Sequence, residues 1–194
     1  MPHEDNRAES SLPLGPAGWA RLDAKGFGPL FIGWVDEGVV RIDLDGVRPE
    51  DGSLERWLRE GEALEERPLP EPIREGLTRY FDGEGFDPAS LPARLSGTKF
   101  QNRAWGALRR VPLGHVRTYA GLAKDVGSPR SMRAIGTAMA QNPIPIIVPC
   151  HRCVAHGYAL GGYSGGLDRK RFLLELEGVV VDGDLVRPGQ LDMF

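Results

Sequence analysis

A cysteine followed directly by a histidine and an arginine ends an apolar, proline-framed stretch in the C-terminal half. Residues 142–149 read Asn-Pro-Ile-Pro-Ile-Ile-Val-Pro and lead into Cys150, His151 and Arg152. Only a thiolate is a strong nucleophile, and a thiol with a pKa near its usual value of about 8.5 is mostly protonated at neutral pH. A neighbouring base or cation must therefore activate it, and His151 and Arg152 supply one of each. The pattern predicts that Cys150 is a nucleophile on a rigid segment.

Two other interpretations of Cys150 remain open from the residues alone. Many intracellular cysteines serve only as small buried apolar side chains, and one Cys-His pair has little specificity. Cys153 and His156 follow closely, so a zinc site or a redox pair is the second alternative. Metal ligation would block the nucleophile, so we expect no metal and no cofactor, with Cys153 as a bystander.

Length and composition indicate a globular protein. With 194 residues and 41% hydrophobic content, the chain suits one ordinary domain or two small ones. It has no run of about 18 apolar residues, and residues 1–9 are polar, so we expect neither a membrane span nor secretion but a cytoplasmic protein. Two cysteines separated by two residues do not form a disulfide framework.

The charge is divided unevenly along the chain. Net charge is −3, yet residues 99–177 carry twelve Lys and Arg against four Asp and Glu, which is +8 and leaves −11 for the remainder. A basic C-terminal module beside an acidic N-terminal one is typical of phosphate binding confined to one half. The alternative is a solvated basic surface without a partner.

We predict a disordered tail over 1–16, an α/β domain over 17–96 and a C-terminal catalytic and DNA-binding domain over 97–194. Alternating apolar residues predict a small antiparallel sheet with helices in the first domain. Its expected elements are strands at 19–23, 30–34 and 39–44, and helices at 53–58 and 73–81, before a linking loop at 83–97.

Three helices are expected in the first part of the C-terminal domain. Thr98 and Gln101 form a capping-box pattern for a helix that ends near residue 110. Thr118 can cap a helix over 119–125, and Ser128 with Pro129 can begin a third that ends near 141. The last two resemble a helix-turn-helix, in which the second helix meets DNA.

The third helix has one arginine among small residues. Met132, Ile135 and Met139 are expected to face inward, and the remaining positions of interest are Arg133, Ala134, Gly136 and Thr137. Small side chains let a helix approach a duplex closely, which would offset the cost of about 1 kcal/mol for a mid-helix glycine. Close packing between helices explains Gly136 equally well.

The chain after the cysteine supplies a flexible loop and a carboxylate. Residues 157–166 are rich in glycine and include Tyr163 and Ser164, so their backbone amides can face a ligand. A helix over 167–177 ends at Glu177, where the helix dipole disfavours a carboxylate unless a partner needs it. Residues 179–186 predict a closing hairpin.

These motifs together resemble O6-alkylguanine-DNA alkyltransferases, the methylated-DNA-protein-cysteine methyltransferases. The ordered spacing of the motifs makes a chance match improbable. The residues that carry the resemblance are Phe100-Gln101, Trp105, Thr118-Tyr119, Arg133-Ala134-Ile135-Gly136, Asn142-Pro143, Pro149-Cys150-His151-Arg152, Tyr163-Ser164-Gly165-Gly166-Leu167 and Glu177-Gly178.

The resemblance implies DNA repair by direct reversal of damage. Cys150 would accept the alkyl group from O6 of guanine irreversibly, so each molecule acts once as a suicide enzyme. His151 would take the thiol proton through a water, Glu177 would orient His151, and Asn142 would brace the segment. Tyr119 would press on a phosphate and protonate the leaving guanine.

The resemblance also implies how DNA is bound. Arg133 would replace the flipped base in the stack, with Ala134, Gly136 and Thr137 on the same helix, which enters the minor groove. Met139, Cys153, Tyr163 and Ser164 would form the base pocket. The implied fold is a ribonuclease-H-like N-terminal domain and a winged helix-turn-helix C-terminal domain, and the implied partner is double-stranded DNA containing O6-alkylguanine, bound by a monomer.

Two rival functions remain open, and so does the range of alkyl adducts that the protein accepts. A lesion-binding protein that does not react is the first rival, although such proteins replace the cysteine. A sequence-specific helix-turn-helix regulator is the second. Pro145 and Gly161-Gly162 suggest a roomy pocket, so we expect adducts bulkier than methyl to be accepted.

Overall fold

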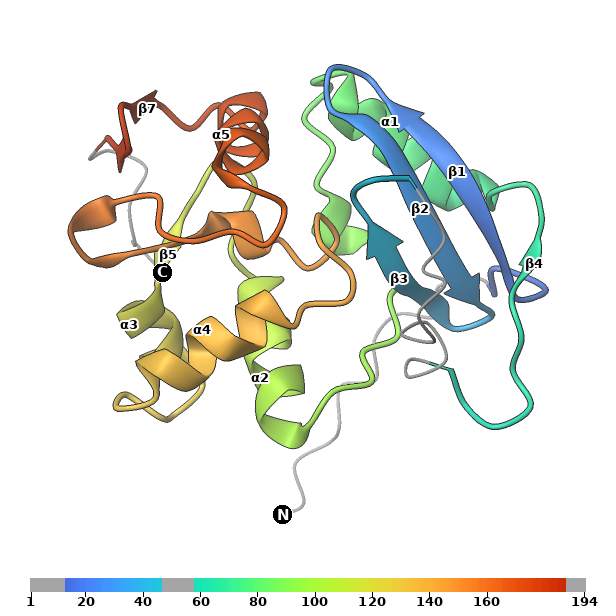
Figure 1. Ribbon diagram of the computed structural model, residues 1–194, viewed down its shortest axis with the longest axis horizontal. Helices are drawn as coiled ribbons and strands as arrows, with labels where there is room; N and C mark the ends of the chain where they lie inside the picture. The colour runs from blue at the N-terminus through green and yellow to red at the C-terminus, as the bar shows by residue number, and fades with distance from the viewer. Residues whose placement is uncertain (1–12, 47–57, 188–194) are drawn as a thin grey trace, which may run out of the picture.

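A computed structural model describes residues 13–46 and 58–187. Figure 1 shows the sheet and the α-helix over residues 71–81 on one side of the molecule, and the α-helices over 99–108, 119–125, 132–140 and 167–176 on the other. The chain crosses between these two groups through residues 82–97. We call the first group the N-terminal domain and the second the C-terminal domain, and the boundaries expected from the sequence stay a prediction.

The N-terminal sheet has the strand order β3-β2-β1-β4. The first three strands are antiparallel, as predicted, whereas the short β4 pairs with β1 in parallel. β2 is buried over six consecutive residues, as expected for a strand inside the sheet, whereas the edge strand β3 also carries the half-buried Arg41 and Asp43. The bounds are β1 Gly18–Ala24, β2 Gly28–Val35, β3 Gly38–Asp43 and β4 Glu65–Glu66.

Helix α1 (Glu71–Phe81) begins two residues before its predicted start and ends where predicted. It packs against β1 and buries Ile73, Leu77 and Tyr80. The following loop contains a short 3₁₀ turn, η2 (Pro88–Ser90), in which the Asp87 carboxylate accepts from the Ala89 amide. Asp87 therefore lies on the segment that connects the N-terminal domain to the C-terminal domain.

The C-terminal domain consists mainly of helices, as expected. Its bounds are α2 Lys99–Leu108, β5 Arg117–Thr118, α3 Tyr119–Asp125, α4 Met132–Ala140, η3 Cys150–Arg152, β6 Cys153–Val154, η4 His156–Tyr158, α5 Leu167–Leu176, β7 Val181–Asp182 and β8 Leu185–Val186. Short strands β5 and β6 pair in parallel and connect the start of α3 to the segment after the cysteine. β7 and β8 form the predicted closing hairpin.

Both predicted threonine caps are present. The Thr98 hydroxyl accepts from the Gln101 amide while the Gln101 side chain accepts from the Thr98 amide, which is a complete capping box. Thr118 accepts from the amide of Gly121 and begins α3. These caps fix where α2 and α3 start.

The prediction for α4 was wrong at its beginning. The helix starts at Met132, with Ser131 as its N-cap residue, because Ser128 and Pro129 form a turn closed by a hydrogen bond from the Ser131 amide to the Ser128 carbonyl. Proline fits such a turn as well as it fits a first helical position. Met132 is consequently 50% exposed, not inward-facing, and Ala138 takes its place in the core beside Ile135.

Two further predictions fall at the edge of the described chain. Most of the expected tail, and nearly all of the expected helix at 53–58, lie outside the described residues. Leu14 and Gly15 donate to Asp36, and the Pro16 carbonyl accepts from Trp34, so residues 14–16 belong to the N-terminal domain. The expected boundary between tail and domain at residue 16 itself stays a prediction.

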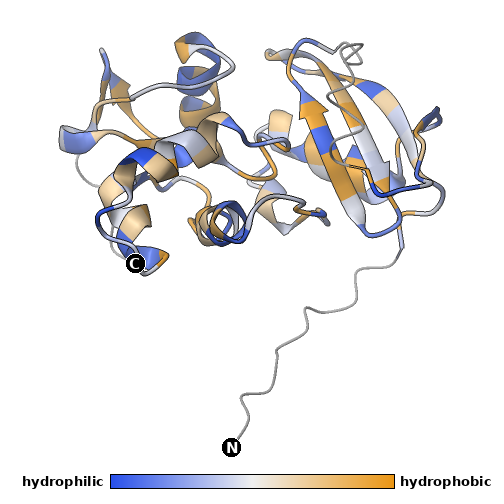
Figure 2. Ribbon diagram, turned by 60° about the horizontal axis from the view of Figure 1, so that its bottom comes forward, coloured by the Kyte–Doolittle hydropathy of each residue, from blue (hydrophilic) through white to orange (hydrophobic). Residues whose placement is uncertain are grey.

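One apolar cluster extends from the sheet into α2, α3 and α4. Figure 2 shows apolar positions concentrated on the strands of the sheet and alternating with hydrophilic positions along the helices. A smaller cluster lies under the closing hairpin, around Val154 and Leu174. No helix in the described ranges is long and apolar enough to span a bilayer. The continuous core makes the two domains one packed body.

Candidate active site

A cavity of about 210 Å³ lies beside Cys150. α3 and α4 contribute one side of it, and the glycine-rich loop before α5 contributes another. Its lining residues are Tyr119, Gly136, Met139, Ala140, Cys150, Gly162, Tyr163 and Ser164. Six of these were predicted from the sequence as site residues, so residues up to 45 positions apart in the chain meet around the thiol.

The apolar segment before the cysteine is a tight, buried turn. Ile144, Ile146, Ile147 and Val148 have no exposed surface, and the Val148 amide donates to the Ile144 carbonyl. Ile146 has φ of 77°, a region that a β-branched residue adopts only under constraint from its surroundings. The predicted rigidity of this segment therefore has a structural basis.

Asn142 braces the turn at both ends. Its Nδ2 donates to the Val148 carbonyl (2.8 Å) and lies 3.1 Å from Cys150 Sγ, while its Oδ1 accepts from the Ile144 amide (3.0 Å). The amide thus fixes the position of the sulfur and stabilises negative charge on it. This geometry is what the predicted bracing role requires.

The thiol of Cys150 is deeply buried, with 4% of the residue exposed. Burial raises the pKa of this thiol, and the Asn142 hydrogen bond and the charge of Lys170 oppose that rise only in part. The resting side chain is therefore a thiol, and its reaction needs a base at the moment of attack.

Lys170 is the buried cation near the sulfur, a residue that the sequence analysis missed. Its Nζ donates to the carbonyls of Cys153 (2.6 Å) and Gly162 (3.3 Å) and to that of Leu160. Burial lowers the pKa of Lys170 to about 8, against the opposing effect of the two cysteines. Three carbonyls thus tie α5 to the cavity loop and to the chain after the nucleophile.

The predicted pair of His151 and Glu177 is present and fully buried. His151 Nε2 lies 2.8 Å from Glu177 Oε1. A carboxylate accepts, so Nε2 carries the proton and Nδ1 keeps its lone pair. Nδ1 is buried and has no hydrogen-bond partner among the described residues. Burial lowers the pKa of His151 despite Glu177, so the neutral ring is available as a base.

The side chain of Arg152 does not serve the thiol, contrary to our interpretation. Its guanidinium contacts both oxygens of Glu177 (2.9 and 3.0 Å), the Val111 carbonyl (2.7 Å) and Asp87 (2.8 Å). Although burial alone would raise the pKa of Glu177, His151 and Arg152 lower it to about 2. The carboxylate is therefore charged, and Arg152 compensates that charge.

Glu177 has an additional partner in the N-terminal domain. The Tyr80 hydroxyl donates to Glu177 Oε1 over 2.8 Å. The sequence offered no signal for Tyr80 or Asp87. For Lys170 a signal existed, because positions 170, 173, 174 and 177 share the buried face of one helix at spacings of three and four.

Two tyrosines, Tyr119 and Tyr163, line the cavity. Tyr119, at the start of α3, is half-buried, and burial raises its pKa to about 12 with a further contribution from the cysteines. The Tyr163 hydroxyl is buried without a hydrogen-bond partner among the described residues. Both are protonated at neutral pH, and Tyr163 has an unused donor at the cavity.

The predicted DNA-binding residues occupy the outer face of α4. Arg133, Ala134 and Thr137 are exposed, and Gly136 lies between them and the cavity. A Cβ at Gly136 would lie 4.0 Å from the Tyr119 ring, an ordinary contact, so close packing between helices does not require glycine there. These residues lie beside the cavity and do not line it, apart from Gly136.

Cys153 is the predicted pocket residue that the cavity lining does not include. Its side chain is fully buried, its amide donates to the Cys150 carbonyl, and its own carbonyl accepts from Lys170. A contact between its backbone and a bound base therefore stays a prediction. Within the described ranges, no three His, Cys, Asp or Glu side chains are arranged to hold a metal ion.

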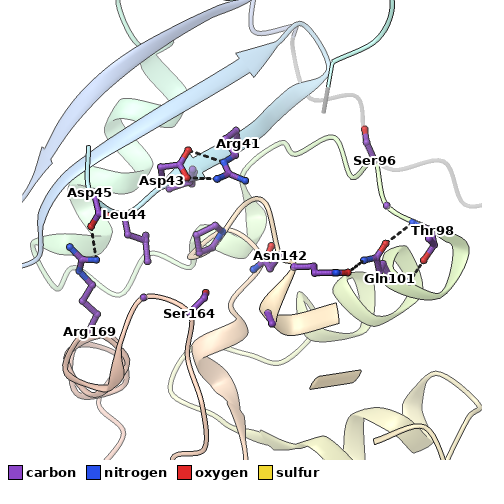
Figure 3. Close-up of a pocket in the computed structure, with 16 residues that line it drawn as sticks. Arg41, Asp43, Leu44, Asp45, Ser96, Thr98, Gln101, Asn142, Ser164 and Arg169 are labelled. Atoms are coloured by element: carbon purple, nitrogen blue, oxygen red, sulfur yellow. Dashed lines mark hydrogen bonds and ion pairs between the residues drawn. The ribbon is translucent and has the colours of Figure 1, made fainter. Parts of the chain in front are cut away.

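A larger cleft of about 600 Å³ adjoins the cavity and is lined by residues of both domains. Figure 3 shows β3 on one side of it, with Arg41 paired to Asp43, and Arg169 of α5 paired to Asp45. Ala140 and Ser164 line both the cleft and the cavity. The cavity beside the thiol and the wider polar cleft are therefore neighbours that share part of their walls.

Comparison with known proteins shows which family the chain resembles. The family model described as "6-O-methylguanine DNA methyltransferase, DNA binding domain" matches residues 99–179. A methylated-DNA–protein-cysteine methyltransferase of Methanosarcina acetivorans is 38% identical over 153 residues, covering 78% of this chain and 92% of the relative. The constitutive methyltransferase of Bacillus subtilis is 37% identical over 158 residues, with coverage of 78% and 90%. The chain belongs to the methylated-DNA–protein-cysteine methyltransferase family.

Solved structures support the same membership. A single-substitution variant of Mycobacterium tuberculosis OGT matches with a TM-score of 0.70 and 33% identity, covering 87% of this chain and 97% of that one. OGT of the same organism in complex with DNA matches with a TM-score of 0.69 and 33% identity, with coverage of 83% and 93%. The methyltransferase fold, a small mixed sheet with helices, therefore extends over both domains. Every predicted site residue lies within the matched range 99–179, whereas Tyr80 and Asp87 lie outside it.

Proposed function

We propose that this protein repairs alkylated DNA by transferring the alkyl group from O6 of guanine to Cys150. The sulfur attacks the alkyl carbon, the carbon–oxygen bond to guanine breaks, and a thioether forms. Cys150 lining a cavity next to the buried His151–Glu177 pair is the observation that carries this proposal. The thioether is stable, so each molecule acts once.

The thiol proton leaves through the relay that the geometry supports. His151 Nδ1 is a buried acceptor with no partner among the described residues, and a water between it and the sulfur would carry the proton. Glu177 stabilises the imidazolium that results. Tyr119, kept protonated by its raised pKa, would give a proton to the departing guanine and regain one from solvent as His151 releases its own.

Access to the cavity requires the base to leave the duplex. α3 and α4 pack on each other as a helix-turn-helix would, and α4 presents Arg133 with small neighbours to the outside. We infer that α4 enters the minor groove and that Arg133 fills the space of the extruded base. Met139 and Tyr163 would then contact the flipped guanine.

The finer assignments of fold and state belong to the same proposal. The antiparallel strands with α1 are consistent with a ribonuclease-H-like domain, and the β7–β8 hairpin with a wing. We infer action as a monomer in the cytoplasm. Sedimentation of the protein with and without DNA tests the monomeric state.

Intact-mass measurement after incubation with a duplex containing one O6-methylguanine tests the function. We expect a gain of one methylene on the peptide bearing Cys150, ending at one equivalent per protein. Tight binding without a mass change would instead identify a non-reacting lesion-binding protein. Equal binding to undamaged DNA of one chosen sequence would identify a regulator.

The cleft bears on the range of adducts. Pro145 and Ser164 line the cleft and Ser164 also lines the cavity, so we infer that a substituent larger than methyl on O6 can extend toward the cleft. We expect O6-benzylguanine to modify Cys150. An unmodified protein after prolonged incubation with excess benzylguanine would contradict this expectation.

A further inference from the structure

The N-terminal domain reaches the catalytic carboxylate through one hydroxyl group. Tyr80 lies in the last turn of α1, 97 residues before Glu177, and the two buried side chains meet over 2.8 Å. We propose that Tyr80 is a positioning residue for alkyl transfer, which holds the Glu177 carboxylate in line with His151. This inference rests on the function proposed above and gives the N-terminal domain a part in the chemistry.

The hydrogen bonds of the carboxylate show why a third donor matters. Glu177 Oε1 accepts from His151 Nε2 (2.8 Å) and from Arg152 (3.0 Å), and both residues belong to η3. Among the described residues, Tyr80 is the donor to this carboxylate from a different element. His151 and Arg152 move together with η3, so Tyr80 ties the carboxylate to a second, independent element.

The Tyr80 hydroxyl also affects how strongly the charge of Glu177 acts on His151. Burial and the Glu177 charge raise the pKa of Tyr80, so its hydroxyl stays protonated and donates. A donor on a carboxylate offsets part of its charge and weakens its attraction for an imidazolium. The titratable and charged groups around the His151–Glu177 pair are Tyr80 from α1, Asp87 before η2, Arg152 from η3, Tyr163 from the loop and Lys170 from α5.

Removal of the hydroxyl therefore has a predictable sign. With one donor fewer, Glu177 attracts a proton on His151 more strongly, so the pKa of His151 rises. A base must be neutral to act, and the fall in rate on the acid side of the pH profile then moves to higher pH. If Tyr80 only packed in the core, loss of its hydroxyl would leave this fall in rate at the same pH.

Tyr80→Phe isolates the hydroxyl because it keeps the ring and its edge contact with Phe81. Tyr158→Phe is the matched control, since Tyr158 lies in η4, outside this cluster. Single-turnover transfer from an O6-methylguanine duplex is measured across pH for each protein, with DNA affinity and thermal unfolding alongside. We expect Tyr80→Phe to be about tenfold slower at neutral pH, with a raised acid limb and unchanged DNA affinity. Tyr158→Phe should match the unsubstituted protein.

A double substitution tests whether Tyr80 acts through Glu177. In a Glu177→Gln background, Tyr80→Phe should slow transfer by less than about twofold. An NMR titration of the His151 ring in the resting protein gives the pKa change without any reaction, and we expect an increase in Tyr80→Phe.

Three results would overturn the role of Tyr80. These are an unchanged rate, a rate loss equal to the loss of folded protein, and an acid limb and His151 titration that match those of the unsubstituted protein. Absence of transfer by the unsubstituted protein would instead refute the proposed function itself. The two failures are therefore distinguishable.

Discussion

The two sides of Cys150 differ in how their polar groups are used. On one side, His151, Glu177 and Arg152 have no exposed side-chain surface and bond mainly to one another. On the other, the cavity is lined by exposed Ser164 and by Tyr163, whose buried hydroxyl has no partner among the described residues. On the first side the charges of Glu177 and Arg152 are paired within the protein and His151 Nδ1 is the atom left without a partner among the described residues, whereas the second side has a hydroxyl donor left for a ligand.

This difference separates the two requirements of alkyl transfer. A base that must act in a dry interior needs fixed partners, which the buried cluster supplies through Glu177. A pocket for a flipped base needs donors that the resting protein does not use. Substitutions on the two sides should therefore change stability and activity in different proportions, and the following predictions test that separation.

Cys150→Ala should abolish transfer completely, because Cys150 supplies the one thiol among the described residues that line the cavity. Binding to an O6-methylguanine duplex should persist, since the α4 surface is untouched. The matched control is Cys153→Ala, which should retain transfer to within a few fold. Intact mass and fluorescence anisotropy measure the two properties, and methylation of the Cys150→Ala variant would refute the assignment.

Glu177→Gln should damage both rate and stability. Loss of the carboxylate removes the partner of His151, and we expect transfer to slow by about 100-fold. It also leaves Arg152 buried with one carboxylate fewer, which should lower the free energy of unfolding by about 3–5 kcal/mol. Rapid-quench assays and urea denaturation measure the two losses. A slow but fully stable variant would show that the cluster is less tightly coupled than proposed.

The same cluster predicts how stability depends on pH. The pKa of Glu177 is lowered from 4.5 to about 2 in the folded protein, so its stabilising contribution is present above 4.5 and is lost as pH falls toward 2. Burial lowers the pKa of His151 below 6.5, so the folded protein also loses stability as pH falls below 6.5. Urea denaturation across pH should show both falls in the free energy of unfolding. The Glu177→Gln variant should lack the fall between pH 4.5 and 2.

Arg133→Ala should affect duplex substrates selectively. If Arg133 fills the space of the extruded base, its removal should slow transfer from a duplex by about tenfold while leaving transfer from free O6-benzylguanine unchanged. Arg130→Ala removes an equal, exposed charge nearby and should cause a smaller, salt-dependent loss. Equal losses on the duplex and on the free base would remove Arg133 from the extrusion step.

Local sequence signals accounted for most of what was predicted correctly. The caps at Thr98 and Thr118, the strands, and the buried segment before Cys150 depend on residues within a few positions of each other. The predicted start of α4 was wrong because Ser128 and Pro129 fit a turn as well as a helix start. The resemblance supplied the roles of His151 and Glu177, and their contact is present.

Contacts between distant segments account for what was missed. Tyr80 and Asp87 belong to elements whose local pattern indicates only an amphipathic helix and a loop, and the packing of the two domains brings them to Glu177 and Arg152. Lys170 was missed for a different reason, since a lysine in a charged helix start is normally solvated. The spacing of Lys170 along α5 placed it on the buried face, but its charge led us to expect an exposed side chain.

Tyr163→Phe gives the finest test of the contrast between the two sides. Deleting a buried hydroxyl that has no partner among the described residues removes a desolvation cost, so the free protein should be as stable as before or more stable by about 1 kcal/mol. Deleting the paired hydroxyl of Tyr80 should instead lower stability by about 1.5–3 kcal/mol. If this donor serves the flipped base, transfer should fall several-fold in Tyr163→Phe. Urea denaturation and single-turnover assays on both variants decide the matter, and a loss of stability in Tyr163→Phe would mean that its hydroxyl already has a partner in the resting protein.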